Sequence, residues 1–187
     1  MSSLVRITSP AVLPLSLAEV KSAARLEGMD EDDALVASYL RSAVEQLDGA
    51  AGILGMCLIS QQWRLTIDRF PISGVITIPL PPLQSVDALT YVDAAGDEQS
   101  ILDYTVYGIG APWQARLSHA FNGGWPTARR QDSAITVTFT AGYGDSWNDV
   151  PHPIRQAITV MVAAAYDGCP RAEEVDSLLG PYRMRVW

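Results

Sequence analysis

Lysine is almost absent from this chain of 187 residues. Of its 13 basic residues only Lys21 is a lysine, and they face 21 acidic residues, so the net charge is −8. The only adjacent basic pair is Arg129–Arg130. Proteins that hold nucleic acid neutralise its phosphates with a patch of lysine and arginine. The charge pattern therefore argues against a protein that grips DNA or RNA.

Cysteine and histidine are scarce too. Cys57 and Cys169 lie far apart and do not form a Cys-x-x-Cys pair, so we expect two buried, reduced thiols and no disulfide. His119 and His152 have no spacing typical of metal ligands, and we interpret both as residues of turns or strand ends. The sequence predicts no metal site.

Long apolar runs are missing as well. No run approaches the roughly 20 residues that a membrane-spanning helix requires. The beginning, MSSLVRITSPAVLPLSL, has neither the charged region nor the long apolar core of a signal peptide. We expect a soluble protein that is made in the bacterial cytoplasm and has no membrane partner.

Motifs for catalysis are also lacking. The chain contains no GKS/T loop, no GxSxG and no HExxH, and YGIGAPW lacks the third glycine of a dinucleotide loop. The acidic run Asp30–Asp33 lacks the alternation of a calcium loop, and the start of a helix explains it. We predict no catalytic residues, no cofactor and no enzymatic activity.

Helical patterns occupy both ends of the chain. Ser16 and Glu19 form the S-x-x-E pattern of a capping box, and Gly28 is expected to end that first helix. Asp30 is expected to cap a second helix, whose apolar residues recur at helical spacing up to Leu47. A third helix is predicted with Pro153 near its start and Gly168 at its end, followed by a short helical turn in RAEEVDSLLG.

Between these helices the apolar period changes to two, which is typical of half-buried strands. Trp63, Leu65 and Ile67 alternate with polar residues, and the same pattern returns in AITVTFTAGYG. DAAGDEQ reads as a hairpin turn. The sequence thus predicts an α+β fold with a helical core from N- and C-terminal helices, a β-rich insert and an extended C-terminal tail. The predicted divisions are residues 1–54 (N-terminal helical part), 55–145 (β-rich insert), 146–180 (C-terminal helical part) and 181–187 (docking tail).

The last residues are unusual for a chain end, because termini are commonly small and polar. After Gly180 the chain runs through two aromatic residues, a methionine, a valine and two arginines. Burying one large apolar side chain is worth roughly 1.5–3 kcal/mol. Such a segment either folds back on its own domain or contacts another chain.

The order of the sequence blocks resembles the head–tail connector (adaptor) proteins of long-tailed bacteriophages and of phage-derived gene transfer agents. The blocks cover nearly the whole chain: LSLAEVKSAARLEGMDEDDALVASYLRSAVEQLDGAAG, LISQQWRLTIDRFP, ITIPLPPLQSVDALTYVDAAG, FTAGYGDSWNDVPHPIRQAITVMVAAAYDG and LLGPYRMRVW. The resemblance leaves open whether the particle is an infectious phage or a gene transfer agent.

This resemblance implies a structural role at the head–tail neck of the virion or phage-like particle. Such adaptors form a ring of twelve copies under the capsid portal, join a downstream tail or stopper protein, and let DNA pass without binding it specifically. Their C-terminal segment binds the portal protein. The resemblance therefore assigns portal binding to Pro181, Tyr182, Arg183, Met184, Arg185, Val186 and Trp187.

Two questions stay open at this point. The acidic balance fits a negative collar that repels DNA, and ordinary solubility explains it equally well. The alternative function is a small β-domain binding module for carbohydrate or single-stranded nucleic acid. It would use Trp113, Trp125 and Trp147 as exposed stacking platforms.

Overall fold

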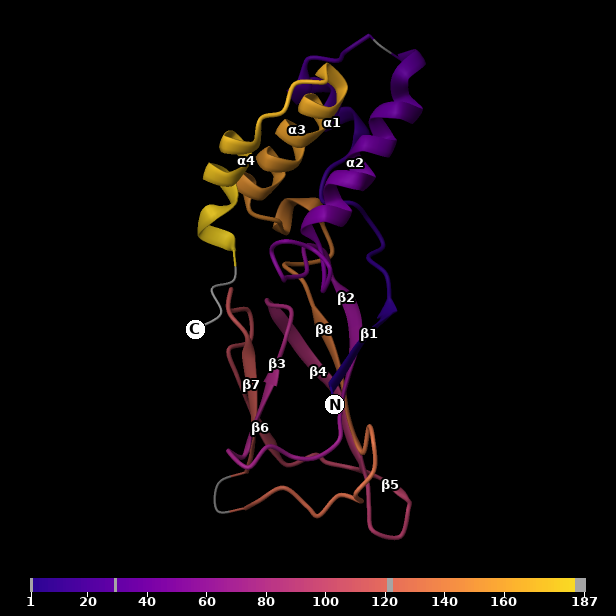
Figure 1. Cartoon of the computed structure of the whole chain (residues 1–187), viewed down its shortest axis with the longest axis vertical. Helices are drawn as coiled ribbons and strands as arrows, with labels where there is room; N and C mark the ends of the chain where they lie inside the picture. The colour runs from indigo at the N-terminus through magenta and orange to yellow at the C-terminus, as the bar shows by residue number, and fades with distance from the viewer. Residues whose placement is uncertain (1, 29, 121–122, 184–187) are drawn as a thin grey trace. The chain divides into compact units, whose positions relative to one another are not determined.

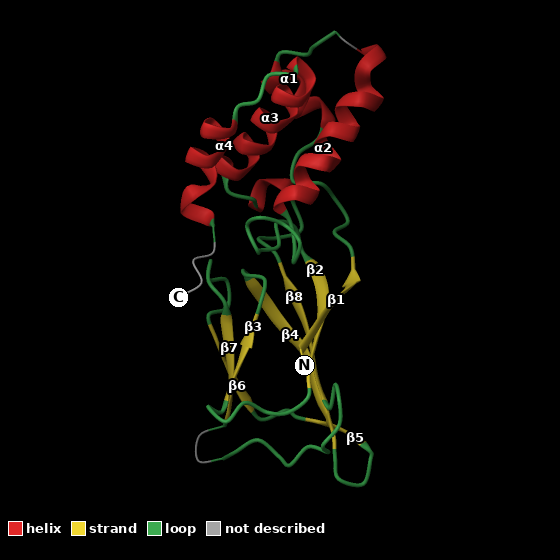
Figure 2. Cartoon of the chain, in the orientation of Figure 1, coloured by secondary structure: helices red, strands yellow, loops and turns green. Residues whose placement is uncertain are grey.

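The computed structural model describes residues 2–28, 30–120 and 123–183 and confirms the α+β class. The chain divides into two compact units (Figures 1 and 2). The β unit comprises Met1–Ser9 and Ser60–Tyr143, and the helical unit comprises Pro10–Ile59 and Gly144–Trp187. The structure therefore changes units at 59/60 and 143/144, where the sequence division stood at 54/55 and 145/146.

The β unit contains two antiparallel sheets. The larger has the order β1-β2-β8-β4-β5, and the smaller has the order β3-β7-β6. The strands are β1 (Ser2–Thr8), β2 (Gln61–Ile67), β3 (Val75–Ile78), β4 (Leu83–Val92), β5 (Glu98–Ser100), β6 (Tyr104–Tyr107), β7 (Ala115–His119) and β8 (Ile135–Ala141).

The predicted alternation holds in the central strand β8. Ile135, Val137 and Phe139 are completely buried, and the threonines between them are half-buried on the other face. Trp63 and Leu65 of β2 are also buried. Ile135, Val137 and Phe139 of β8 lie opposite Ile67, Leu65 and Trp63 of β2, so the two strands build one continuous core layer.

Strand β1 lies within residues 1–54, which the sequence analysis assigned to the N-terminal helical part, and it was not predicted. Ser2–Thr8 pairs antiparallel with β2, with Ser2 opposite Ile67 and Arg6 opposite Trp63. Six of its seven residues are exposed, so neither face is a buried one. A strand without a buried face needs no apolar–polar alternation, and the periodicity test could not detect it.

The predicted hairpin turn is confirmed. Oδ1 of Asp93 accepts hydrogen bonds from the backbone N–H groups of Ala95, Gly96 and Asp97, at 2.9–3.0 Å. These bonds, led by that from Asp97, hold the pKa of Asp93 below its ordinary value. Gly96 has φ +102°, a conformation that favours glycine.

The helical unit contains four α-helices, α1 (Leu17–Ala24), α2 (Asp33–Leu47), α3 (His152–Asp167) and α4 (Ala172–Leu179), and three short 3₁₀ turns, η1 (Asp30–Asp32), η2 (Trp147–Asp149) and η3 (Gly180–Tyr182). Helix α3 contacts each of the other three α-helices. Its apolar side bears Ile154, Ile158 and Val162, which are completely buried. Helices from both ends of the chain thus share one core.

Some predicted helix ends are right and some are wrong. The capping box at Ser16 and Glu19 is confirmed, and Gly168 ends α3 with φ +65°. Gly28 does not end α1, because Arg25 already takes the left-handed conformation, with φ +60°, and its N–H donates to the carbonyls of Lys21 and Ser22. Asp30 does not cap α2, because the 3₁₀ turn η1 comes first and α2 begins only at Asp33; the carboxylate of Asp30 binds Lys21 instead.

Candidate functional site

The acidic run Asp30–Asp33 is a structural anchor of the helical unit. Nζ of Lys21 lies 2.8 Å from Oδ1 of Asp30 and 2.6 Å from Oδ1 of Asp33. The Lys21 side chain is nine-tenths buried, and its hydrogen bonds to the two carboxylates raise its pKa. The hydrogen bond from Lys21 lowers the pKa of Asp30. The chain's single lysine therefore ties α1 to the beginning of α2.

A second hydrogen bond ties the same acidic run to α3. The hydroxyl of Tyr166 donates to Oδ2 of Asp32 at 2.6 Å, and this bond raises the pKa of Tyr166. The sequence explained the acidic run by the favourable charge at a helix start; the structure adds direct side-chain contacts to Lys21 and Tyr166 as a second reason. Sequence spacing gave no signal for them, because the contacts join residues 9, 12 and 134 positions apart.

The histidines and possible metal ligands are scattered. Among the residues that the structure describes, no three His, Cys, Asp or Glu side chains could hold a metal ion together. Nδ1 of His119 lies 2.9 Å from the carbonyl oxygen of Ala120, and its ring packs edge-on against Trp125 at 5.9 Å.

In the described part of the chain no helix has the length and apolarity to span a bilayer.

Two of the three predicted tryptophan platforms are already occupied. The ring of Trp125 stacks on Phe70 with centroids 5.0 Å apart, and its Nε1 donates to the carbonyl of Gly74. Trp147 packs under the guanidinium of Arg155 at 4.8 Å. Both are half-buried, whereas Trp113 is 64% exposed. The prediction of three exposed platforms is therefore wrong for Trp125 and Trp147.

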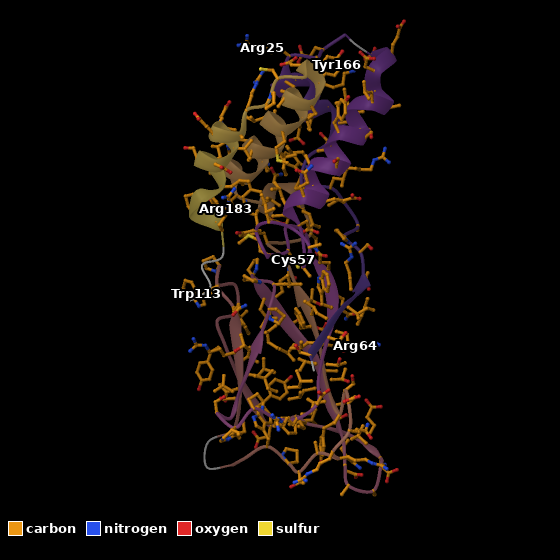
Figure 3. The ribbon with its side chains drawn as sticks, in the orientation of Figure 1. Arg25, Cys57, Arg64, Trp113, Tyr166 and Arg183 are labelled. Carbon is orange, nitrogen blue, oxygen red and sulfur yellow. The ribbon has the colours of Figure 1, made fainter. Side chains whose placement is uncertain are left out.

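The prediction for the cysteines is confirmed for Cys57 and is wrong about the burial of Cys169. Both are free thiols; Cys57 is buried, and Cys169, expected to be buried, is exposed. Cys169 follows Gly168, where α3 has ended, so it lies in a connection and not in the apolar stripe of a helix. Figure 3 labels Cys57.

The described part of the C-terminal segment is fixed to α4. Gly180–Tyr182 adds a 3₁₀ turn, and the N–H of Arg183 donates to the carbonyl of Leu179 at 3.2 Å. The guanidinium of Arg183 (labelled in Figure 3) also binds the carboxylate of Asp176 on α4. The extended tail that the sequence predicts from Pro181 is therefore a 3₁₀ turn at Pro181 and Tyr182. Met184, Arg185, Val186 and Trp187 lie outside the described residues.

The two units differ sharply in charge. The helical unit has 14 acidic and 7 basic residues, which gives −7, and the β unit has 7 acidic and 6 basic residues, which gives −1. Nearly all of the net charge of −8 thus belongs to one unit. The field of the protein is therefore concentrated around the helices.

Comparison with known proteins shows that solved structures share this two-unit fold. No family model matches the chain, and no curated protein does either. The chain is, however, similar to chains in three structures of gene transfer agent (GTA) particles, at 27% identity in each. The neck of an empty particle, computed with C6 symmetry, has a TM-score of 0.79 and covers 99% of this chain and 97% of the other.

The other two structures agree. The virion of a native particle gives a TM-score of 0.78 with 98% and 97% covered, and the neck of a native particle, computed with C12 symmetry, gives 0.76 with 99% and 97% covered. The likeness spans both units and nearly the whole of each chain. It confirms the resemblance to neck proteins of phage-like particles that the sequence blocks predicted.

Proposed function

We propose that this protein is a structural head–tail connector (adaptor) subunit without enzymatic activity. In this role it forms a ring under the capsid portal, joins the portal to a downstream tail or stopper protein, and lets DNA pass. The observation that carries the proposal is the full-length similarity to chains of GTA necks. The protein would be made in the bacterial cytoplasm and then assembled into the particle.

The symmetry of the similar necks supports a ring of identical subunits. Those structures were computed with C6 and C12 symmetry. A cyclic ring requires a heterologous contact, in which each copy presents one surface to its left neighbour and a different surface to its right neighbour. We propose twelve copies for this chain, as the family resemblance implies.

The C-terminal segment, Pro181–Trp187, is proposed to bind the portal. Arg183 is held against α4 by its contacts with Asp176 and Leu179, so the four residues after it start from a fixed point. Burial of Met184, Val186 and Trp187 in the portal would supply roughly 1.5–3 kcal/mol each. Arg185 can pair with portal carboxylates. Each contact is modest, and a ring makes them durable because linked sites rebind.

The charge of the helical unit supports passage of DNA. Twelve copies at −7 place on the order of a hundred negative charges in one collar. We propose that the helical unit lines the channel and repels the phosphates, so DNA slides without specific binding. The binding-module alternative is weaker, because Trp125 and Trp147 are occupied within the protein.

Two measurements test this function. Negative-stain images of the full chain, alone or on portal-bearing capsids, are expected to show rings. Deletion of residues 184–187 is expected to abolish attachment to those capsids while the melting temperature stays unchanged, because the contacts of Arg183 remain. Replacing Glu173 and Glu174 with Gln in the full chain is the matched control and should leave attachment intact. Attachment that survives the deletion would contradict portal binding by this segment.

A further inference from the structure

Two exposed apolar surfaces of the β unit are not explained by portal binding. The first, the hairpin patch, is formed by Tyr107, Ile109 and Trp113 at the connection between β6 and β7; these side chains are 58%, 59% and 64% exposed. The second, the β1 edge, carries Val5 and Ile7, which are 55% and 42% exposed. Clusters of large exposed apolar side chains mark interaction surfaces.

Backbone hydrogen bonds attach the hairpin patch to β4. The N–H of Gly110 donates to the carbonyl of Leu83 at 2.8 Å, and Ile109 forms a β-bridge with Leu83, so the loop is fixed to the start of β4. The N–H of Ala111 donates back to Gly108 at 3.2 Å. Tyrosine and tryptophan held in a fixed loop lose little entropy on binding, and they are typical anchors of protein interfaces.

The β1 edge is open. Among the described strands β1 pairs with β2 alone, so its other side lies at the margin of the five-stranded sheet. The opposite margin is β5, which has only three residues and begins with Glu98, as protected edges do. Strand β1 has seven residues, is rich in Leu, Val and Ile, and offers a template to which another strand can pair.

These two surfaces lie on opposite sides of the β unit. The hairpin patch is joined to β4, and β2 and β8 separate β4 from β1 in the sheet. Figure 1 shows β1 on one side of this unit and β6 and β7 on the other, and in Figure 3 Trp113 and Arg64, a residue of β2, project to opposite sides. This is the placement that a heterologous ring contact requires.

We propose that the β1 edge of one copy docks on the hairpin patch of the next copy of this chain. Strand β1 adds beside β6, which is itself an edge strand of the smaller sheet, and Val5 and Ile7 pack against Tyr107, Ile109 and Trp113. The inference rests on the proposed ring and specifies the surfaces that close it.

The aromatic rings of the hairpin patch supply only part of the area that a stable contact requires. A tyrosine and a tryptophan bury roughly 150–250 Å² each, so at about six-tenths exposure the two aromatic rings supply roughly 200–300 Å². A stable interface needs about 800 Å² per partner. The aromatic rings alone are therefore too small, and the contact needs the strand edge, which is about 23 Å long.

Cross-linking tests the contact directly, whether or not free chains close into rings. One variant carries Ile7→Cys and the other Tyr107→Cys, each with Cys169→Ser; the buried Cys57 is kept. With a short bismaleimide, a 1:1 mixture should give cross-linked heterodimers well in excess of either homodimer. The control replaces Tyr107→Cys with Ile72→Cys, a fully exposed site outside the patch. No excess over this control would overturn the proposal.

Charged substitutions give a second, independent readout. Ile7→Glu or Trp113→Glu alone should prevent rings, and their equal mixture should form dimers, because each partner keeps one intact surface. The melting temperature of each variant should match that of the wild type, since both side chains are exposed. Ile72→Glu should leave rings intact, and rings that survive Trp113→Glu would contradict the contact.

The outcomes separate this inference from the function on which it rests. Wild-type rings together with failed cross-linking would overturn the β1–hairpin contact and leave the connector role standing. If the wild-type chain makes no ring even on portal-bearing capsids, the connector function itself fails.

Discussion

The two units of this molecule differ in net charge and in exposed apolar surface. The helical unit carries −7 of the net charge of −8, and its acidic run Asp30–Asp33 is held by Lys21 and Tyr166. The β unit is nearly neutral and exposes the β1 edge and the hairpin patch. A nearly neutral surface can approach an identical copy with little electrostatic repulsion, whereas two surfaces with a charge of −7 each repel one another. The difference is what we would expect if, as proposed, the β unit makes the contact between copies and the helical unit repels DNA.

The largest stability effect is expected from the core of the β unit. Phe139→Ala removes a completely buried ring from the central strand β8, where it lies opposite Trp63 and Val86. We expect a loss of about 3–5 kcal/mol in the free energy of unfolding. Chemical denaturation measures it. Thr138→Ala, on the other face of β8, is the matched control and should change stability by less than about 1 kcal/mol. A similar small loss for Phe139→Ala would mean that β8 is not central to the core.

Moving charge within each unit sharpens the contrast further. Glu173→Arg with Glu174→Arg in the helical unit, and Asp97→Arg with Glu98→Arg in the β unit, each change the net charge from −8 to −4. We expect the wild type not to bind duplex DNA at low salt, and the helical-unit variant to bind more tightly than its β-unit counterpart. Fluorescence anisotropy against salt concentration measures this. Equal binding by the two variants would show that net charge matters and its location does not.

The sequence predicted the regular parts of both units, because local signals control them. The capping box at Ser16 and Glu19, the left-handed Gly168 and the alternation in β8 all depend on neighbouring residues. The sequence-based prediction failed where the local structure depends on residues far away in the chain. Strand β1 exists because β2 lies beside it, and Asp30 turns to Lys21 on another helix. The same limit applies to the site: the aromatic-rich end and the exposure of Trp113 were predicted from the sequence, whereas the stacking of Trp125 on Phe70 and the exposure of Tyr107 required the structure.

Removing the lysine anchor is expected to cause an intermediate effect confined to the helical unit. Lys21→Met leaves the carboxylates of Asp30 and Asp33 close together without their cation; because both carboxylates contact solvent, the melting temperature should fall by only a few degrees at pH 7. Since the pKa of Asp30 is lowered in the folded protein, its contribution is present above about pH 4 and is lost as pH falls through the lowered pKa. The variant should therefore lose less stability on acidification than the wild type.

Arg41→Met is the control for this variant, because Arg41 is exposed and its Nε donates only within α2, to the carbonyl of Ala37. Its melting temperature should stay close to that of the wild type. A pH profile of Lys21→Met that runs parallel to the wild type down to pH 3 would disprove the stabilising role of the Lys21–Asp30 pair.

The smallest effect is expected at alkaline pH, from Tyr166. Its pKa is raised, first by the hydrogen bond to Asp32, so the folded state holds the phenolic proton more tightly than the unfolded state. Stability from this bond is fully present below the ordinary pKa of about 10 and is lost as pH rises through the raised value. Tyr166→Phe removes the titrating group and should lower the melting temperature slightly at pH 7. Above about pH 10 its curve should therefore fall less steeply than that of the wild type. Tyr104→Phe makes the corresponding change in the β unit, where burial is the main cause of the raised pKa. Tyr104→Phe should also make the melting temperature fall less steeply at high pH, although it leaves the hydrogen bond between Tyr166 and Asp32 in place. If Tyr166→Phe and the wild type lose stability in parallel above about pH 10, the bond between α3 and the acidic run does not stabilise the helical unit.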